Sequence, residues 1–298
     1  MTNKANASTG SSAAGLRGVF AATSSISDVD GEKGELIYQG YNIHDLAEHA
    51  AFEEVVFLLW NKRLPNRAEL AELEQALRAA YGVPAELIAL MKQFPRGADP
   101  IDVLRTAISA LEFYDLSSRD ISRESSIKTA IRLTAQFPTI VAAADRIRRG
   151  LEPLEPDSSL NIASSFLYLL RGEKPSEHDA RVFDVCLTLH ADHELNASTF
   201  TARVAAGTLA DMYAAVTAAI GALSGPLHGG ANTAVMKTLL EIGSVENVEP
   251  YVKQALAEKR KMMGFGHAVY KTEDPRATHL RKFSKEMGEA AEIGRAHV

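Results

Sequence analysis

Apolar residues recur along most of the chain at the spacing of amphipathic helices. One stripe starts after Asn66, whose side chain suits a helix N-cap, and repeats every three or four residues: Leu70, Leu73, Leu77 and Tyr81. A second follows Asp99-Pro100, a cap and a first-turn proline whose missing N–H costs nothing: Ile101, Leu104, Ile108 and Leu111. Similar patterns predict helices near 126–149, 160–171, 177–194, 197–221, 232–242, 249–263 and 275–290.

Strand signals are confined to one short stretch. Residues 26–38 contain Asp30-Gly31, a pair typical of tight turns, and predict a small β-hairpin. The sequence therefore predicts an all-α fold with one N-terminal hairpin. The predicted helix over 197–221 is rich in alanine, so neighbouring backbones can approach it closely, and we expect it in the core or at a subunit interface.

Composition narrows the class of protein. The chain has 298 residues, 46% hydrophobic and 23% charged, which suits one or two globular domains and is too weakly charged for disorder. Its 32 basic and 38 acidic residues give a net charge of −6, which argues against nucleic acid or an anionic membrane as the main partner. The most apolar stretch, 205–223, is too short and too interrupted to span a bilayer. A small-molecule ligand is the better expectation.

Both ends of the chain are predicted to lie outside the folded part. Residues 1–15 are rich in Ser, Thr, Asn and Ala and lack the apolar segment of a secretory signal, so they predict a disordered tail. With Cys186 as the single cysteine, this indicates the cytoplasm. Residues 293–298 back-translate to the start of a widely used sequencing adapter and are predicted not to be gene-encoded; the alternative is a genuine polar tail.

The first candidate site is the segment 189–198, Leu-His-Ala-Asp-His-Glu-Leu-Asn-Ala-Ser. His190 and His193 are three residues apart at a predicted helix end, so a metal pair is conceivable. The spacing offers no third ligand, which favours binding of an anion or substrate, or a structural polar helix end, over a metal.

The second candidate site is the segment 225–232, Gly-Pro-Leu-His-Gly-Gly-Ala-Asn. Gly225-Pro226 ends the preceding helix and Asn232 suits the cap of the next, which places His228 at a helix N-terminus. The positive end of the helix dipole disfavours the imidazolium, so we expect a neutral histidine that donates a hydrogen bond to a carbonyl becoming an enol. The alternative is a turn histidine that bonds its own loop.

Two further segments suit charged ligands. Residues 263–270, Met-Gly-Phe-Gly-His-Ala-Val-Tyr, follow the basic run 259–261 and can offer backbone N–H groups and positive charge to a phosphorylated ligand. There His267 either delivers a proton or is a solvent-facing loop histidine. The segment Asp274-Pro-Arg276 predicts a helix cap followed by an arginine. The planar guanidinium of Arg276 either binds a carboxylate through two hydrogen bonds or lies on the surface.

In this order, the four segments closely resemble the citrate synthase family, including its 2-methylcitrate synthase branch. Supporting similarity lies at 16–19, 27–34, 41–47 and 137–142, so the resemblance spans about 16–290. It implies a two-domain helical fold in which 16–228 belong to the large domain and 229–292 begin an incomplete small domain. It also implies a homodimer or higher oligomer.

The family condenses acetyl-CoA with oxaloacetate and hydrolyses the thioester to citrate and CoA. The resemblance implies that His228 donates to the thioester oxygen and that His267 protonates the oxaloacetate carbonyl oxygen. It assigns oxaloacetate binding to His193 and Arg276. The implied CoA-binding residues are Lys261, Met262, Met263, Gly264 and Phe265. No metal or resident cofactor is implied, because acetyl-CoA acts as a co-substrate.

The chain departs from the family pattern at one point. The proton-abstracting aspartate is expected well beyond His267, past Val298, and no carboxylate in the chain matches its motif. We therefore expect a polypeptide of these 298 residues to have little or no synthase activity and poor solubility. The alternatives are a 2-methylcitrate synthase, whose propionyl-CoA substrate differs by a methylene worth about 1–3 kcal/mol, and a non-catalytic relative.

Overall fold

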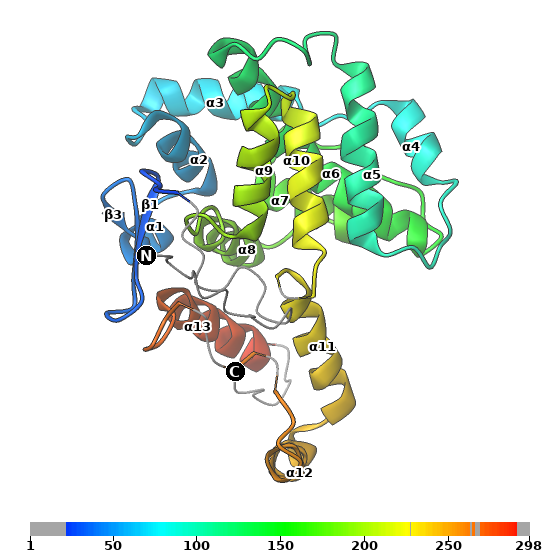
Figure 1. Ribbon diagram of the computed structural model, residues 1–298. Coiled ribbons are helices and arrows are strands. Elements are labelled where there is room, and N and C mark those ends of the chain that lie inside the picture. Colours follow the sequence, from blue (N-terminus) through cyan, green and yellow to red (C-terminus); the bar gives the residue numbers. More distant parts are fainter. Residues whose placement is uncertain (1–21, 227, 263, 266–268, 291–298) are drawn as a thin grey trace, which may run out of the picture.

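The computed structural model describes residues 22–226, 228–262, 264–265 and 269–290. Helices make up most of them, which confirms the predicted all-α fold (Figure 1). The elements of the main body follow in chain order: α1 (Ile43–His49), α2 (Phe52–Asn61), α3 (Arg67–Ala79), α4 (Ala85–Met91), α5 (Pro100–Leu111), the 3₁₀ turn η1 (Glu112–Tyr114), α6 (Arg123–Arg148), α7 (Ile162–Arg171), α8 (Glu177–Leu189), α9 (Ala197–Gly207) and α10 (Met212–Leu223).

The predicted hairpin is confirmed and is extended by a third strand. β1 (Ser27–Asp30) pairs antiparallel with β2 (Glu35–Tyr38), which pairs antiparallel with β3 (Tyr41–Asn42). Ser27 lies directly opposite Tyr38, so both side chains lie on the same face of the sheet. β3 is two residues long and leads straight into α1, which explains why no alternating pattern revealed it.

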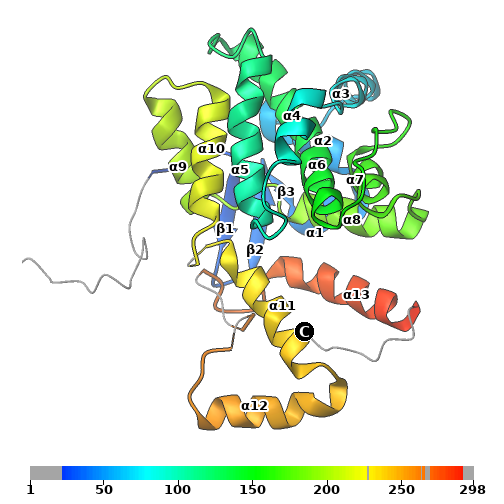
Figure 2. The same ribbon diagram turned by 90° about the vertical axis from the view of Figure 1, so that its right-hand side faces the viewer.

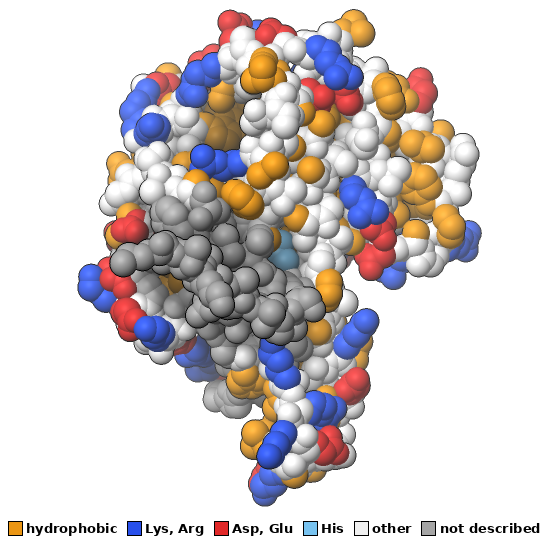
Figure 3. Space-filling view, in the orientation of Figure 1, with side chains coloured by type: hydrophobic (Ala, Val, Ile, Leu, Met, Phe, Trp, Pro, Cys, Tyr) orange, Lys and Arg blue, Asp and Glu red, His pale blue; other side chains and the backbone are white. Residues whose placement is uncertain are grey.

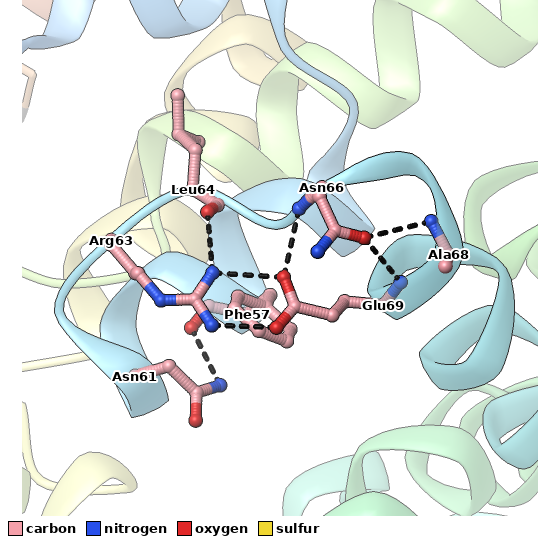
Figure 4. A network of polar contacts seen from close by, with 7 residues as sticks. All are labelled: Phe57, Asn61, Arg63, Leu64, Asn66, Ala68 and Glu69. Carbon is pink, nitrogen blue, oxygen red and sulfur yellow. Dashed lines mark hydrogen bonds and ion pairs between the residues drawn. The ribbon is translucent and has the colours of Figure 1, made fainter.

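The two helix starts that the caps predicted are confirmed. The Asn66 side chain accepts hydrogen bonds from two N–H groups of the first turn of α3 at 2.9 and 3.0 Å, and the Glu69 carboxylate accepts from the Asn66 N–H at 2.9 Å (Figure 4). The Arg63 guanidinium donates two hydrogen bonds to Glu69 and lowers the pKa of that carboxyl to about 2. The Asp99 side chain accepts from the Ile101 N–H at 3.1 Å.

The alanine-rich segment predicted as one helix over 197–221 forms two helices, so that prediction is wrong. α9 ends at Gly207, and Leu209 takes a left-handed φ of +64°. α10 then starts after Asp211, whose side chain accepts from the Ala214 N–H at 2.9 Å. A glycine followed by a good N-cap favours a new helix start over continuation. The two helices pack side by side as a hairpin (Figure 1).

Other predicted boundaries also shift. α8 ends at Leu189 instead of continuing to 194, because the following loop bonds to the sheet. The helix predicted over 249–263 ends at Ala257, shortly before a left-handed residue. Asn232 lies inside its helix and does not cap it; Gly229 occupies the N-cap position with no side-chain cap.

Apolar contacts join the sheet to the helices. One core packs Leu36 and Tyr38 of β2 against α1, α2 and α8, and Leu280 and Phe283 of α13 (Pro275–Ala290) pack onto it. A second core lies among α4, α5, α6 and α10, and a third among α2, α3, α6 and α7. The first core therefore fixes the sheet, the end of α8 and α13 relative to one another.

Part of the chain projects from this body. α11 (Gly230–Ile242), the 3₁₀ turn η2 (Val245–Asn247) and α12 (Val248–Ala257) extend away from it, whereas α13 returns and packs against α1 and α8 (Figures 1 and 2). Within the described ranges, no helix is long and apolar enough to cross a membrane. The division into 16–228 and 229–292 stays a prediction, and the tails 1–15 and 293–298 lie outside the described residues.

Candidate active site

The loop between α8 and α9 carries His193, and the sheet fixes its backbone. Tyr38 donates a hydrogen bond to the Asp192 carbonyl oxygen at 2.8 Å, and the Asp192 N–H donates to the same hydroxyl at 3.2 Å. Ser27 donates to the Asp192 carboxylate and accepts from the Glu194 N–H at 3.1 Å. Glu194 has a φ of +55°, which is costly for a residue with a Cβ and is held here by these contacts.

His193 is oriented by a tyrosine from a distant part of the chain. Its Nε2 lies 3.1 Å from the Tyr270 hydroxyl oxygen, and the two rings meet edge-on with centroids 5.6 Å apart. Tyr270 is 4% exposed, and burial raises its pKa to about 12, so the phenol is neutral at pH 7. A substrate-binding imidazole needs such a fixed orientation.

His190 does not share this environment. Its Nδ1 donates a hydrogen bond to the Cys186 carbonyl oxygen at 2.7 Å, one turn back in α8. His190 and His193 therefore face different partners. Over the described part of the chain, no group of three or more His, Cys, Asp or Glu side chains could hold a metal ion.

Arg276 lies in the first turn of α13 as predicted, but it is not a surface arginine. Its side chain is 17% exposed. Asp274 caps the helix by accepting from the Arg276 N–H at 3.0 Å, and it also accepts from the Arg276 Nε and Nη2 at 3.0 and 2.7 Å. Burial acts to lower the pKa of Arg276. The effects of the Asp274 carboxylate and of the nearby Tyr270 and Tyr38 are larger in sum, so the pKa of Arg276 is raised. In this structure the guanidinium bonds the Asp274 carboxylate, and the binding of a substrate carboxylate by Arg276 stays a prediction.

His228 lies immediately before α11, as predicted, and bonds to a different helix. The Ser198 N–H in the first turn of α9 donates to the His228 Nε2 at 3.3 Å, and the Ser198 hydroxyl oxygen lies 2.9 Å from the same nitrogen. The alternative of a histidine bonding only its own loop is therefore wrong. A ring nitrogen that accepts from a backbone N–H carries no proton, so neutral His228 has its proton on Nδ1. Burial lowers the pKa of His228, which favours this neutral form.

The segment predicted to bind CoA is described only in part. Met263 and His267 lie outside the described residues. Gly264 has a φ of +91°, and a Cβ there would lie 3.0 Å from a methyl carbon of Val235 in α11. Phe265 is 69% exposed. Lys261 and Met262 follow the end of α12 in irregular backbone, so the assignment of 261–265 to CoA stays a prediction.

Comparison with known proteins places this chain in a family. The family model described as "Citrate synthase, C-terminal domain" matches residues 15–296. The chain belongs to the citrate synthase family. It is 53% identical to citrate synthase 2 of Bacillus subtilis, with 92% of this chain and 73% of that protein covered. It is 43% identical to a 2-methylcitrate synthase of Mycobacterium tuberculosis, with 92% and 69% covered.

Citrate synthases of known structure share the fold. The citrate synthase of Thermoplasma acidophilum, solved in a ternary complex with carboxymethyl coenzyme A and oxaloacetate, superposes with a TM-score of 0.87 at 31% sequence identity. The superposition covers 93% of this chain and 73% of that one. The resemblance seen in the motifs is therefore confirmed at the level of family and fold.

Around the candidate site of this citrate synthase family member, the structure brings in residues that the sequence patterns did not assign. Tyr270 and Ser198 orient His193 and His228, and both stand inside the motifs that carry the resemblance. Proximity to the histidines in those motifs is the signal that could have found them. Tyr38 and Ser27 position the His193 loop from more than 150 residues away. Ser27 begins the segment 27–34 that supports the resemblance, but no local pattern shows that either residue reaches Asp192.

Proposed function

We propose that this chain acts on acetyl-CoA and oxaloacetate and forms citrate and CoA. The observation that carries the proposal is His228, a half-buried histidine at the start of α11 whose Nε2 accepts from the Ser198 N–H. Its neutral form presents Nδ1–H as a hydrogen-bond donor. That donor suits a thioester oxygen, which gains negative charge as the methyl group loses a proton and the enol forms.

Oxaloacetate binding falls to the second group of side chains. Arg276 offers a planar guanidinium near Tyr270, whose hydroxyl meets His193, and we propose that this guanidinium, held by Asp274 through Nε and Nη2, also receives a carboxylate of oxaloacetate. His193 adds a polar contact whose direction Tyr270 fixes. His267 is assigned protonation of the oxaloacetate carbonyl oxygen as the carbon–carbon bond forms.

Binding of CoA is assigned to the segment after α12. Lys261 supplies positive charge, Gly264 takes a left-handed conformation, and Phe265 presents an exposed ring, with Met262 and Met263 between them. Backbone N–H groups and a basic side chain suit the phosphates of CoA. No resident cofactor or metal is part of the proposal.

The reaction also needs a base for the methyl proton. The resemblance places this aspartate past Val298, and we propose that a polypeptide of residues 1–298 by itself turns over slowly or not at all. Assays of function therefore use the full-length gene product.

The surface of α9 and the single cysteine bear on the oligomeric state and the cellular location of the protein. α9 is largely apolar, yet it has no fully buried side chain, and Val204 and Leu209 are 56% and 73% exposed. Figure 3 shows few charged side chains over α9 and α10 on that face. We propose that a second copy covers this hairpin in a homodimer or higher homo-oligomer. Cys186 is the one cysteine and cannot form an intrachain disulfide, which supports a reducing cytoplasm.

Release of CoA from acetyl-CoA in the presence of oxaloacetate tests the proposal. We expect turnover by the full-length protein and a loss on the order of a hundredfold or more in kcat for His228→Ala. Propionyl-CoA is the comparison substrate, because it differs from acetyl-CoA by one methylene. A higher kcat/KM for propionyl-CoA would identify a 2-methylcitrate synthase, and oxaloacetate binding without CoA release would identify a non-catalytic relative.

A further inference from the structure

The β1–β2 hairpin contacts both segments that are proposed to bind oxaloacetate. Near its open end, Ser27 and Tyr38 bond the backbone and carboxylate of Asp192, next to His193. At its tip, the Gly31 carbonyl oxygen accepts from the Lys271 N–H at 2.8 Å. One short hairpin therefore contacts two loops that are almost 80 residues apart in the sequence.

The tip lies so close to the second segment that side chains are excluded from two of its positions. A Cβ on Gly31 would lie 2.3 Å from the Val269 carbonyl oxygen. A Cβ on Gly34 would lie 2.7 Å from the Thr272 Cγ2 and 2.8 Å from the Glu273 carbonyl oxygen. These distances are shorter than real Cβ contacts, so the approach depends on glycine at both positions.

The tip is closed by hydrogen bonds of its own. The Gly34 N–H donates to the Asp30 carbonyl oxygen at 2.8 Å, and the Asp30 carboxylate accepts from the Glu32 and Lys33 N–H groups, each at 3.0 Å. Glu32 also forms an ion pair with Lys271 across the contact. The hairpin therefore acts as a stiff element.

The segment at the tip carries Tyr270 and Arg276 of the proposed oxaloacetate site. Val269 precedes Tyr270, whose hydroxyl meets His193, and Glu273 precedes the Asp274 cap of Arg276. A shift of 269–273 away from the sheet would move Tyr270 and Arg276 together. It would leave His193 in place, because its loop is bonded to the other end of the hairpin.

We propose that the β1–β2 hairpin sets the position of Tyr270 and Arg276 relative to His193, and that Gly31 and Gly34 are positioning residues for oxaloacetate. The proposal rests on the proposed function. It assigns these glycines a role in substrate affinity through the segment 269–276. Neither glycine touches the substrate.

Gly40 provides a matched control. It lies in the same sheet, in the turn between β2 and β3, and has a φ of +89°, and a Cβ at this position would have nothing within 4 Å. Gly34 has a φ of +73°. Gly34→Ala and Gly40→Ala therefore introduce similar backbone strain, and only Gly34→Ala adds a clash with 269–273. Gly31 does not have a positive φ, so Gly31→Ala tests the contact with 269–273 without added backbone strain.

The first experiment measures steady-state kinetics and oxaloacetate binding calorimetry on the full-length enzyme. We expect Gly31→Ala and Gly34→Ala to raise the KM and Kd for oxaloacetate on the order of tenfold, since small misplacements of binding groups are costly. The KM for acetyl-CoA should stay within twofold of its value in Gly40→Ala. Adding Thr272→Ser to Gly34→Ala removes one of the two clashes and should recover part of the affinity.

A second experiment separates this proposal from the proposed function. Amide hydrogen exchange at Lys271, whose N–H bonds Gly31, should be slow in the wild type and Gly40→Ala and faster in Gly31→Ala and Gly34→Ala. Absence of oxaloacetate binding by the wild type would overturn the proposed function. Wild-type binding combined with unchanged oxaloacetate affinity in both glycine variants would overturn the positioning role.

A milder variant covers the case in which the glycine variants do not fold. Glu32→Lys reverses an exposed charge opposite Lys271 without adding a clash. It should raise the KM for oxaloacetate by about two- to fivefold, because an exposed ion pair contributes at most about 1 kcal/mol. Adding Lys271→Glu should restore the wild-type value. An unchanged KM in Glu32→Lys, or failure of the second change to restore it, would contradict the proposal.

Discussion

The imidazoles of His44 in α1 and His279 in α13 share a hydrogen bond. The His44 Nδ1 lies 2.8 Å from the His279 Nε2, and the rings are tilted by 40° with centroids 5.0 Å apart. One nitrogen must donate and the other accept, so a doubly protonated pair loses the bond and brings two positive charges together. The pair lies where α13, which carries Arg276, packs against α1.

We expect the protein to lose stability in mild acid through this pair. Burial and the neighbouring His44 lower the pKa of His279 below 6.5; Glu48 of α1 acts in the opposite direction and Lys282 of α13 in the same one. The unfolded chain therefore binds this proton at a higher pH than the folded chain does. The contribution of His279 to the free energy of unfolding is constant above pH 6.5. This free energy falls as the pH drops through 6.5 toward the pKa of His279 in the folded protein. Thermal unfolding midpoints recorded at pH values across this range measure the loss of stability.

The substitution His279→Gln should make that pH dependence shallower. His178, an exposed histidine on α8, provides a control, and His178→Gln should leave the wild-type slope unchanged. Identical slopes for the wild type and His279→Gln would rule out the histidine pair as the source.

Tyr270→Phe tests how much the orientation of His193 contributes to binding. The substitution keeps the buried ring and removes the hydroxyl that lies 3.1 Å from the His193 Nε2. A hydrogen bond of this kind contributes about 0.5–1.5 kcal/mol, so the Kd for oxaloacetate should rise by about two- to twelvefold. Titration calorimetry on the full-length enzyme measures it, with Tyr251→Phe as a control on α12. An unchanged Kd would show that His193 does not depend on this contact.

Local signals in the sequence predicted the local parts of the structure. Asn66 and Asp99 act through side chains that bond N–H groups two or three residues away, so a short window of sequence contains the whole cap. The prediction of one helix over 197–221 was wrong because alanine suits a continuous helix, whereas Asp211 starts a new one. Its capping role was a local signal that the interpretation passed over.

The candidate site was predicted only as far as its motifs reach. His193, His228 and Arg276 stand in recognisable segments, and the placement of His228 near a helix start and of Arg276 in a first helical turn followed from nearby glycine, proline and aspartate. His193 lies in a loop and not at the predicted helix end. Tyr38 and Ser27 act on the His193 loop across the folded sheet. Such contacts depend on which elements become neighbours, and single-residue patterns do not contain that information.

Ser198→Ala should lower turnover more than it lowers oxaloacetate affinity. The hydroxyl lies 2.9 Å from the His228 Nε2 and 2.7 Å from the Asn196 Oδ1, so it links the ring to the residue that caps α9, and its loss removes that link while the Ser198 N–H bond remains. We expect kcat to fall on the order of tenfold and the KM for oxaloacetate to change less than twofold, because His228 acts on the thioester. Thr201→Ala, which removes a hydroxyl that donates to the Ala197 carbonyl oxygen of the same helix, is the control. A larger effect on the oxaloacetate KM than on kcat would contradict this role.

Tyr213→Phe should destabilise the α9–α10 hairpin from a point distant from the substrates. The hydroxyl of Tyr213, which is 1% exposed, donates to the Asp115 carboxylate at 3.0 Å, and Arg132 of α6 pairs with the same carboxylate. A buried hydrogen bond to a charged group contributes about 1.5–3 kcal/mol, so the free energy of unfolding should fall by that amount in urea titrations. Tyr114→Phe, at an exposed site in η1, should stay within about 0.5 kcal/mol of the wild type. A loss no larger than that of the control would mean that Arg132, Ser117 and Thr129 satisfy Asp115 without the phenol, and that α10 is held by its apolar face.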